Sequence, residues 1–239
     1  MKYLDLTLPT PADNLACDEA LIDLCEEGGE DEILRFWEPS APFVVVGYAN
    51  QAALEVNLEA CQAAGIKVFR RCSGGGTVVQ GEGCLNYSVI LRMDENGPLQ
   101  SISGTNHFIL GRQQAALEPL VQAKIDIQGH TDLAIRNLKF SGNAQRRKRK
   151  FLLFHGTFLL HFDIPLIEKV LRMPSKQPDY RRDRPHTEFL TNLNLPTEAV
   201  KSAIKHIWRA PEPFTTVPLE KIDELARQKY SSDEWNLKF

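Results

Sequence analysis

Three consecutive glycines, residues 74–76, interrupt a β-rich part of the chain and limit what it can fold into. The segment before them, IKVFRR (66–71), and the segment after them, LNYSVIL (85–91), have the alternating, β-branched pattern of strands. Glycine adds little to packing and costs backbone entropy, so a run of three indicates a point where a partner approaches the main chain closely. We therefore expect the glycine loop, RRCSGGGTVVQGEG (70–83), to join these two sheet elements and to receive a ligand.

The two arginines at the start of this loop indicate what kind of ligand it receives. A guanidinium presents a fork of donors that fits carboxylate and phosphate groups, so Arg70 and Arg71 favour an anion. No GK[ST] follows Gly76, and the loop lacks the GxGxxG spacing of dinucleotide folds. Both common phosphate motifs are therefore excluded, and a purely structural glycine-rich hairpin is the alternative interpretation.

The rest of the chain mixes strand and helix patterns without a regular alternation. Strands are predicted at residues 2–8, 32–38, 42–48, 66–71 and 85–91, with a dense β region over 125–163. Helices are predicted at residues 15–28, 57–65, 104–123, 165–172, 196–209 and 219–230. The first helix is expected to be capped by Asp13 or Asn14, and the third to be interrupted or bent at Pro119. Because βαβ repeats are missing, this order favours an α+β class with mixed, mostly antiparallel sheets flanked by helices.

Length and charge limit the organisation of the protein and its partners. A chain of 239 residues can bury a sizeable core, and no stretch resembles a linker, so we expect a single domain over residues 1–239. The net charge of −3 argues against nucleic acid as a partner. The sequence has neither a signal-peptide pattern nor an apolar run of membrane-spanning length, which predicts a cytoplasmic protein outside the membrane.

The cysteines and histidines do not form a metal-binding pattern. Five cysteines are an odd number, and they include no CxxC pair, which argues against disulfides and structural zinc. Cys17 and Cys25 lie on an apolar stripe of the first predicted helix and are expected in the core. His155 and His161 have no cysteine or third histidine nearby, so no metal held directly by the protein is expected.

A second segment, HTDLAIRNLKFSGNAQRRKRKFLLFHGTFLL (130–160), complements the glycine loop. It places Lys139 just ahead of a small-residue turn, and His155 ahead of a glycine and a threonine. The motifs RRxSGGGTV, TDL, KxSGNAQ and HGT, in this order and spacing, resemble the catalytic domain of the lipoate-protein ligase A family. The resemblance covers most of the chain, from NLACDEAL to DEWN, and implies the fold that this family shares with biotin protein ligases.

The same resemblance implies a site. Lys139 matches the family's active-site lysine, Asp132 the acidic residue of its NDL motif, and His155 the histidine of its HHGT motif. Gln80 stands where many members have histidine. With Lys139 as the catalytic residue, the implied lipoate- and adenylate-binding set is Arg71, Ser73, Gly74, Gly75, Gly76, Thr77, Gln80, Asp132, Ser141, Gly142, His155, Gly156 and Thr157.

The implied activity is an ATP-dependent ligation. Lipoate or octanoate would be activated to an acyl-AMP and transferred to a lysine of a lipoyl carrier, such as a 2-oxoacid dehydrogenase acyltransferase subunit or a glycine cleavage H protein. Bringing a carboxylate to a triphosphate requires fixed cations and backbone N–H donors, and Lys139 and Arg71 are suitable cations. Mg²⁺ would arrive with ATP, bound mainly by its phosphates. The chain stops before the accessory domain of some ligases, so we expect either a self-sufficient short form or a separate accessory subunit.

The sequence leaves two other functions open. An octanoyl or lipoyl transferase of the same superfamily would carry the acyl group on a cysteine placed shortly before the segment that matches TDL. This chain has no cysteine after Cys84, so only Cys72 or Cys84 beside the glycine loop is available. A non-catalytic lipoyl-binding module would not need a cation such as Lys139 beside Asp132. The basic run RRKRK (146–150) is predicted to be a solvated hairpin tip, or else to guide an acidic lipoyl domain or nucleotide phosphates.

Overall fold

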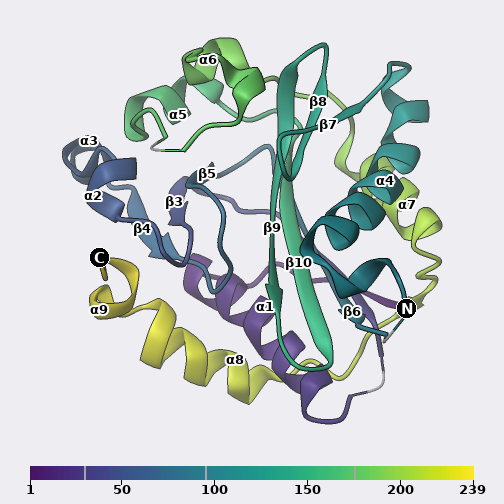
Figure 1. The fold of residues 1–239 in the computed structure, drawn as a ribbon. Coiled ribbons are helices and arrows are strands. Elements are labelled where there is room, and N and C mark those ends of the chain that lie inside the picture. The colour runs from purple at the N-terminus through teal and green to yellow at the C-terminus, as the bar shows by residue number, and fades with distance from the viewer. Residues whose placement is uncertain (30, 95, 175) are drawn as a thin grey trace.

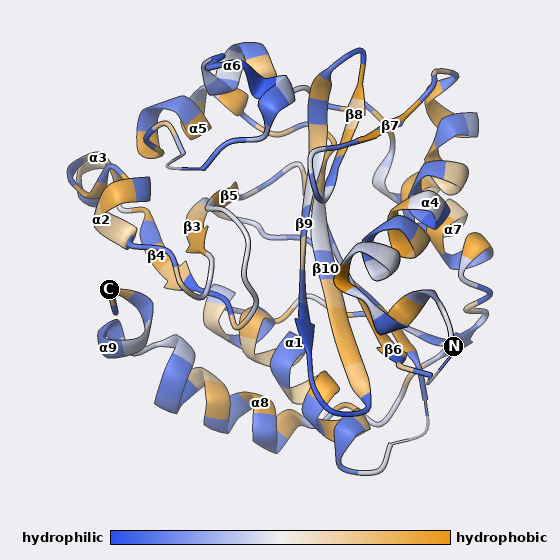
Figure 2. Cartoon of the chain, in the orientation of Figure 1, coloured by the Kyte–Doolittle hydropathy of each residue, from blue (hydrophilic) through white to orange (hydrophobic). Residues whose placement is uncertain are grey.

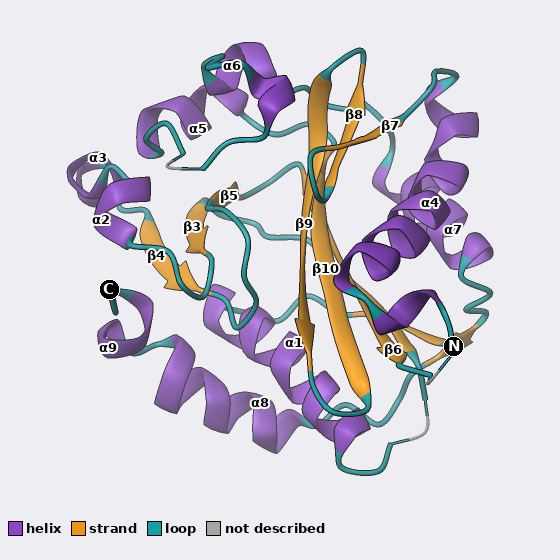
Figure 3. Cartoon of the chain, in the orientation of Figure 1, coloured by secondary structure: helices purple, strands orange, loops and turns teal. Residues whose placement is uncertain are grey.

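The computed structural model describes residues 1–29, 31–94, 96–174 and 176–239, and it consists of two β-sheets with helices packed around them (Figure 1, Figure 3). The strands are β1 Lys2–Asp5, β2 Ile33–Trp37, β3 Phe43–Val46, β4 Lys67–Arg70, β5 Val78–Gln80, β6 Cys84–Arg92, β7 Asp126–Gln128, β8 Asp132–Ile135, β9 Leu138–Arg147, β10 Phe151–Leu159 and β11 Glu212–Pro213. The α-helices are α1 Pro11–Glu26, α2 Ala52–Glu55, α3 Leu58–Ala63, α4 Ile102–Val121, α5 Ile164–Val170, α6 His186–Phe189, α7 Thr197–Ile207, α8 Leu219–Leu225 and α9 Asp233–Asn236. Shorter turns of helix are η1 Pro98–Gln100, η2 Asp179–Arg181 and η3 Ala226–Tyr230.

The larger sheet has the strand order β11-β1-β2-β6-β10-β9-β8-β7, and the smaller sheet has the order β4-β3-β5. In the larger sheet β1 pairs in parallel with β2 and β11, and the pairings from β2 through β6 to β7 are antiparallel. In the smaller sheet β3 is parallel to β4 and antiparallel to β5. The predicted α+β class with mixed, mostly antiparallel sheets is confirmed.

Alternation along the central strands gives the larger sheet two apolar faces. On β10, Phe151 and Leu153 pack in the cluster formed with α1 and α8, whereas Leu152 and Phe154 pack with α4 and α7. Figure 1 shows α1 beside α8 on one side of the sheet and α4 beside α7 on the other. Figure 2 shows hydrophobic residues along β10 and hydrophilic residues at the end of β9. By the same alternation, His155 continues the α1 side of β10 and brings a polar group to that face.

Helix α1 begins at Pro11, earlier than the sequence pattern predicts, and Thr10 is its N-cap. The Thr10 hydroxyl accepts from the Asp13 N–H at 3.2 Å, and the Asp13 carboxylate accepts from the Thr10 N–H at 3.1 Å, which is a capping box. Asn14 is buried and donates to the carbonyls of Leu8 and Thr10. The prediction of Asp13 or Asn14 as the cap was wrong because Asp13 is the second member of the box.

Helix α4 runs unbroken through Pro119, so the predicted interruption was wrong. Proline removes one backbone donor, and Pro119 lies in the last turn, where little helix remains to be disrupted. The core placement of Cys17 and Cys25 is confirmed, since the two residues are 0% and 2% exposed.

The glycine loop joins β4 to β5 within the smaller sheet, and not β4 to the segment 85–91 as expected. The three-residue β5 pairs with β3 before the chain turns at Gly83, where φ is +88°, and enters β6 of the larger sheet. The loop therefore extends from the smaller sheet toward β9 and β10. An ideal Cβ on Gly75 would lie 3.4 Å from the Ala144 Cβ on β9.

Candidate active site

The glycine loop presents a row of unused main-chain donors. The amides of residues 73–77 donate to no acceptor in the described part of the chain. Gly75 has φ +85°, a conformation that favours glycine, and ideal Cβ atoms on Gly74 or Gly76 would meet nothing within 4 Å. Successive free N–H groups at an open loop form an anion-binding concavity. The loop is therefore suited to an anion through its backbone.

Arg71 shapes this loop from inside. Its Nη2 donates to the carbonyls of Gly74 (2.5 Å) and Gly76 (2.7 Å), and its Nε donates to Ser73 Oγ (3.1 Å). Burial lowers the pKa of Arg71 to about 10. Arg71 is 8% exposed, and its guanidinium donates to carbonyl oxygens of the loop. It therefore holds the loop in place, and the loop amides are the groups that remain free to contact an anion.

Arg70 does not face the loop at all, which corrects the interpretation of both arginines as anion ligands. Its side chain is fully buried and donates to the carbonyls of Gly47, Asn50, Trp235 and Lys238 at 2.6 to 3.0 Å. Figure 1 shows the resulting position of α9 beside β4. Arg70 therefore fastens the C-terminal segment to the smaller sheet.

Replacing Arg70 by methionine is expected to lower the free energy of unfolding by about 3 kcal/mol, because several buried carbonyls lose their donor at once. Urea denaturation followed by circular dichroism measures this change. Arg149→Met, at an exposed position, serves as the control and should change stability by less than about 0.5 kcal/mol. Equal midpoints for the two variants would contradict the role assigned to Arg70.

Lys139 and Asp132 meet as the sequence indicates. Lys139 Nζ lies 2.8 Å from Asp132 Oδ1, with 24% and 11% of the two side chains exposed. A register shift in the β8–β9 pairing displaces Lys139 from regular alternation, as bulges near functional sites often do. An ideal Cβ on Gly142 would lie 2.9 Å from Nζ, so glycine at this position makes room for the ammonium.

Tyr180 completes this pair and was missed in the sequence. Its hydroxyl donates to Asp132 Oδ2 at 2.9 Å from η2, which is 48 residues away in the chain. Burial and the Asp132 charge raise the pKa of Tyr180, so the hydroxyl stays a donor. Asp132 is thereby held by Lys139 on one oxygen and by Tyr180 on the other.

His155 links the glycine loop to α1. Its Nε2 lies 2.6 Å from Ser73 Oγ, and its Nδ1 lies 2.9 Å from Asp18 Oδ2. Asp18 in turn accepts from Arg35 Nη1 at 2.7 Å and from Ser88 Oγ at 2.8 Å. The structure therefore brings the predicted residues Ser73 and His155 together, and adds an aspartate that the sequence analysis did not select. In the sequence Asp18 and Glu19 follow Cys17 on the first helix, and no local signal showed that these two acids are buried.

Gln80 on β5 and Thr157 on β10 belong to a partly buried polar group. Gln80 Nε2 donates to Thr157 Oγ1 at 2.6 Å, and Thr157 Oγ1 donates to Asn86 Oδ1 at 2.5 Å. Within the described residues, Gln80 Oε1, Asn86 Nδ2 and Thr77 Oγ1 have no partner. Buried polar atoms normally find a partner, so this corner is suited to a polar group or an internal water.

Gly156 and Ser141, two of the predicted site residues, pack against Asn143. An ideal Cβ on Gly156 would lie 1.7 Å from Asn143 Oδ1, which leaves glycine as the residue that fits. Ser141 is 1% exposed and accepts from Asn143 Nδ2 at 3.2 Å. Both residues shape β9 and β10 behind the site.

The basic run 146–150 lies at the tip of the β9–β10 hairpin, as predicted, but it is solvated only in part. Arg146 pairs with Glu19 at 2.8 Å, and Lys148 pairs with Asp23, both acids lying on α1. Arg147 donates to main-chain carbonyls ahead of α4. These contacts fix the β9–β10 hairpin and leave residues 149–150 exposed.

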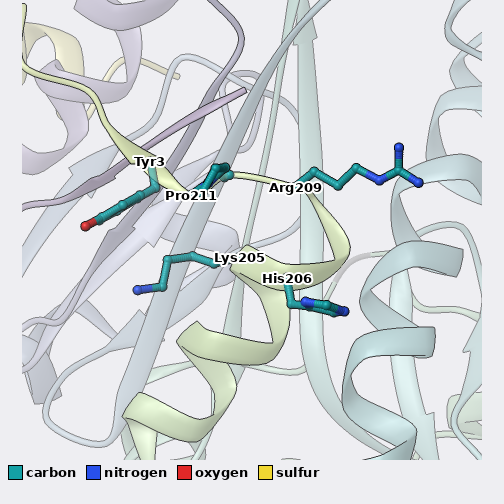
Figure 4. A pocket seen from close by; sticks show the side chains of 6 residues that line it. Tyr3, Lys205, His206, Arg209 and Pro211 are labelled. Carbon is teal, nitrogen blue, oxygen red and sulfur yellow. The ribbon is translucent and has the colours of Figure 1, made fainter.

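Two surface pockets, of about 600 and 750 Å³, lie around the C-terminal end of α7, and neither is lined by the glycine loop, β9 or β10. The first is shown in Figure 4 and is lined by Tyr3, Lys205, His206, Arg209, Ala210 and Pro211. In the described ranges no cluster of three or more His, Cys, Asp or Glu suits a metal ion. In the same ranges no helix has both the length and the apolar character to cross a bilayer.

The site therefore combines a paired lysine, a loop of free amides and an Asp–His–Ser hydrogen-bond chain. A profile for the lipoyl protein ligase A/B catalytic domain matches residues 10–206, and the chain belongs to this family. The octanoyltransferase LipM of Geobacillus kaustophilus is 28% identical over 99% of this chain and 98% of its own. A crystal structure of lipoate-protein ligase A bound with ATP has a TM-score of 0.84 and 25% identity, covering 99% of each chain. The bipartite lipoate protein ligase of Thermoplasma acidophilum, described with its E2 lipoyl domain, has a TM-score of 0.82 and 25% identity, covering 99% of this chain and 96% of its own.

These matches confirm the family and fold implied by the motifs of the sequence. The chain is an enzyme of the lipoate-protein ligase family. The relatives include proteins named as ligases and proteins named as octanoyltransferases, so the source of the acyl group is a separate question.

Proposed function

We propose that the protein is an ATP-dependent ligase that activates lipoate or octanoate to an acyl-AMP and transfers the acyl group to a lysine of a lipoyl carrier domain. The observation that carries this proposal is the ion-paired Lys139 on the strand that faces a glycine loop of free amides. The family match and the ATP-bound ligase of the same fold support it.

The residues of the site are suited to a nucleoside triphosphate. The amides of residues 73–77 supply neutral donors for phosphate oxygens, and Lys139 supplies a compact cation on the neighbouring strand. ATP supplies the leaving group that makes the carboxyl carbon reactive, and its Mg²⁺ is expected to bind through the phosphates. Lys139 stabilises the charge that develops as the carboxylate approaches the phosphate, which is the task that fixed donors perform best.

The cysteines do not favour a thioester path. Cys72 and Cys84, the pair next to the glycine loop, are 6% and 2% exposed. Burial raises the pKa of Cys84 to about 12 and also raises the pKa of Cys72, so neither is a thiolate near neutral pH. No cysteine follows Cys84 in the sequence. The likeness to LipM nevertheless makes an octanoyltransferase the second candidate function.

The proposed acceptor is a lipoyl carrier domain, as in the archaeal ligase described with its E2 lipoyl domain. That relative is bipartite, which supports a separate accessory chain as part of the proposed adenylation by this protein.

One assay tests the proposal and the second candidate together. The purified protein is incubated with lipoate or octanoate, ATP and Mg²⁺, and acyl-AMP is measured by mass spectrometry. A parallel reaction offers octanoyl-carrier thioester without ATP. Acyl-AMP in the first reaction supports the ligase, whereas acyl transfer in the second reaction alone supports the octanoyltransferase.

Replacing Cys72 and Cys84 together by serine is expected to preserve ligation and to cost about 1 to 2 kcal/mol of stability, since both residues are packing groups. Ligation is measured by the mass of the modified carrier. A hydroxylamine-sensitive acyl adduct on the wild-type protein, or a folded double variant without activity, would contradict this expectation and assign a cysteine nucleophile.

A further inference from the structure

The hydrogen-bonded chain from α1 to the glycine loop has the order of a proton relay. We propose that Asp18, His155 and Ser73 accept the proton that the carrier lysine loses when its amine attacks the acyl carbonyl. This role rests on the proposed function, because it assigns groups to the transfer half of the same reaction. In the proposed step Ser73 accepts the amine proton, whereas Asp18 is a positioning residue that acts through His155.

The sheet register builds the relay as a row across three strands. Arg35 on β2 pairs with Ser88 on β6, and Ser88 pairs with His155 on β10. Their side chains lie on the α1 side of the sheet, where Asp18 contacts each of them. The row is rigid, since Arg35 and Ser88 are 0% exposed and Asp18 is 3% exposed.

The donors around Asp18 select the tautomer of His155. Arg35 Nη1 and Ser88 Oγ both donate to Oδ1, which leaves Oδ2 to accept from His155 Nδ1. Burial alone would raise the pKa of Asp18, but Arg35 and His155 outweigh it and hold that pKa below its usual value. With the hydrogen on Nδ1, Nε2 carries a lone pair directed at Ser73, as this bonding pattern assigns.

Ser73 is oriented from two sides. Arg71 Nε donates to its Oγ at 3.1 Å, so the hydroxyl hydrogen of Ser73 is directed to His155 Nε2 at 2.6 Å. Ser73 is 1% exposed and lies at the base of the loop whose Gly74 and Gly76 are open. A hydroxyl held in this way passes a proton inward and shields Nε2 from bulk water.

The transfer step balances with these groups. The carrier lysine nitrogen forms a C–N bond to the acyl carbon, and the C–O bond to AMP breaks with its electron pair on the phosphate oxygen. The amine proton passes to Ser73 Oγ while the Ser73 hydrogen passes to His155 Nε2. The imidazolium is stabilised by the Asp18 carboxylate until it releases the proton to solvent. Acyl-AMP formation involves no proton loss of this kind, so the relay should serve transfer alone.

The experiment separates the two half-reactions in Asp18→Asn and Ser73→Ala. Adenylation is measured as pyrophosphate release without carrier, and transfer is measured in a single turnover of supplied octanoyl-AMP onto a lipoyl domain. We expect transfer to fall about 100-fold in each variant, as for loss of general base catalysis. Adenylation should fall by a much smaller factor than transfer, because the loop amides and Lys139 that serve it remain in both variants. In Asp18→Asn the amide oxygen accepts from Arg35 and Ser88, so the amide NH₂ faces His155 Nδ1 and donates to it. His155 must then carry its hydrogen on Nε2, which is the opposite tautomer.

Asp23→Asn is the matched control, because it makes the same change on the same helix at an acid that pairs with Lys148. Its transfer rate should equal that of the wild type. Ser73→Ala keeps the buried Asp18–Arg35 pair and decides the question if Asp18→Asn does not fold. Equal losses in both half-reactions, unchanged transfer, or an acyl ester on Ser73 found by mass spectrometry would overturn the relay. If the wild type makes no acyl-AMP from acid and ATP, the proposed function is wrong. The relay is still tested in that case, because the transfer measurement starts from supplied octanoyl-AMP.

Discussion

Lys139→Ala should lower acyl-AMP formation and acyl transfer by about 100- to 1,000-fold, the scale of losing one preorganised electrostatic donor. Lys139 is half-buried and held by Asp132, so its charge is fixed beside β9 before substrate arrives. Pyrophosphate release and the mass of the modified carrier measure the two steps, and circular dichroism checks the fold. Lys139→Arg should fail as well, because a planar fork does not replace a compact ammonium.

Lys124→Ala provides the control for this charge removal. Lys124 Nζ also lies 2.8 Å from a carboxylate, that of Asp126, but 81% of its side chain is exposed. Its loss should leave both half-reactions at wild-type rates. Activity of Lys139→Ala above about a tenth of the wild type would mean that the developing charge is stabilised elsewhere.

Gly75→Val should abolish binding of lipoate and nucleotide. The backbone φ of +85° strains any side chain with a Cβ, and the Cβ itself would lie 2.9 Å from Arg71 Nη2. Displacing Arg71 would release the carbonyls of Gly74 and Gly76 and change the direction of the loop amides. Isothermal titration calorimetry with lipoate and with ATP is expected to show no heat of binding.

Gly65→Val separates backbone strain from the effect on the site. Gly65 has φ +67°, and an ideal Cβ there would meet nothing within 4 Å, so the variant has comparable strain at the end of α3. It should lose stability but retain binding in proportion to the folded fraction. Near wild-type affinity of Gly75→Val for acyl-AMP would identify the loop as a structural hairpin, the alternative left open by its sequence.

Several features of this protein follow from the sequence by itself. Strand and helix periodicity is a local property, so the order of elements and the α+β class were predictable. The glycine run at residues 74–76 indicated close access to the main chain, and the motif around Lys139 carried the family. Asp132 was correctly placed beside Lys139 because both residues lie in the motifs that carry the family.

The local sequence pattern did not predict the role of a residue where that role depends on the groups that its side chain contacts in the folded protein. Arg70 and Arg71 are adjacent and identical in type, yet one fastens the C-terminal segment and the other shapes the glycine loop. Arg70 is the last residue of β4 and Arg71 the first residue after it, and only the packed structure shows what each side chain contacts. The charges of Arg146 and Lys148 were likewise visible, but their acidic partners on α1 were not.

Asp18 shows most clearly what the tertiary structure decided. It lies 137 residues from His155 and 70 from Ser88, and it contacts both because β6 and β10 pair beneath α1. In the sequence Asp18 is one acid on an apolar helix stripe, and nothing local distinguishes a solvated carboxylate from a buried one. Burial makes the difference, since a carboxylate removed from water must be fully hydrogen-bonded. The fold supplies those donors from three separate strands, which is why the relay exists only in the folded chain.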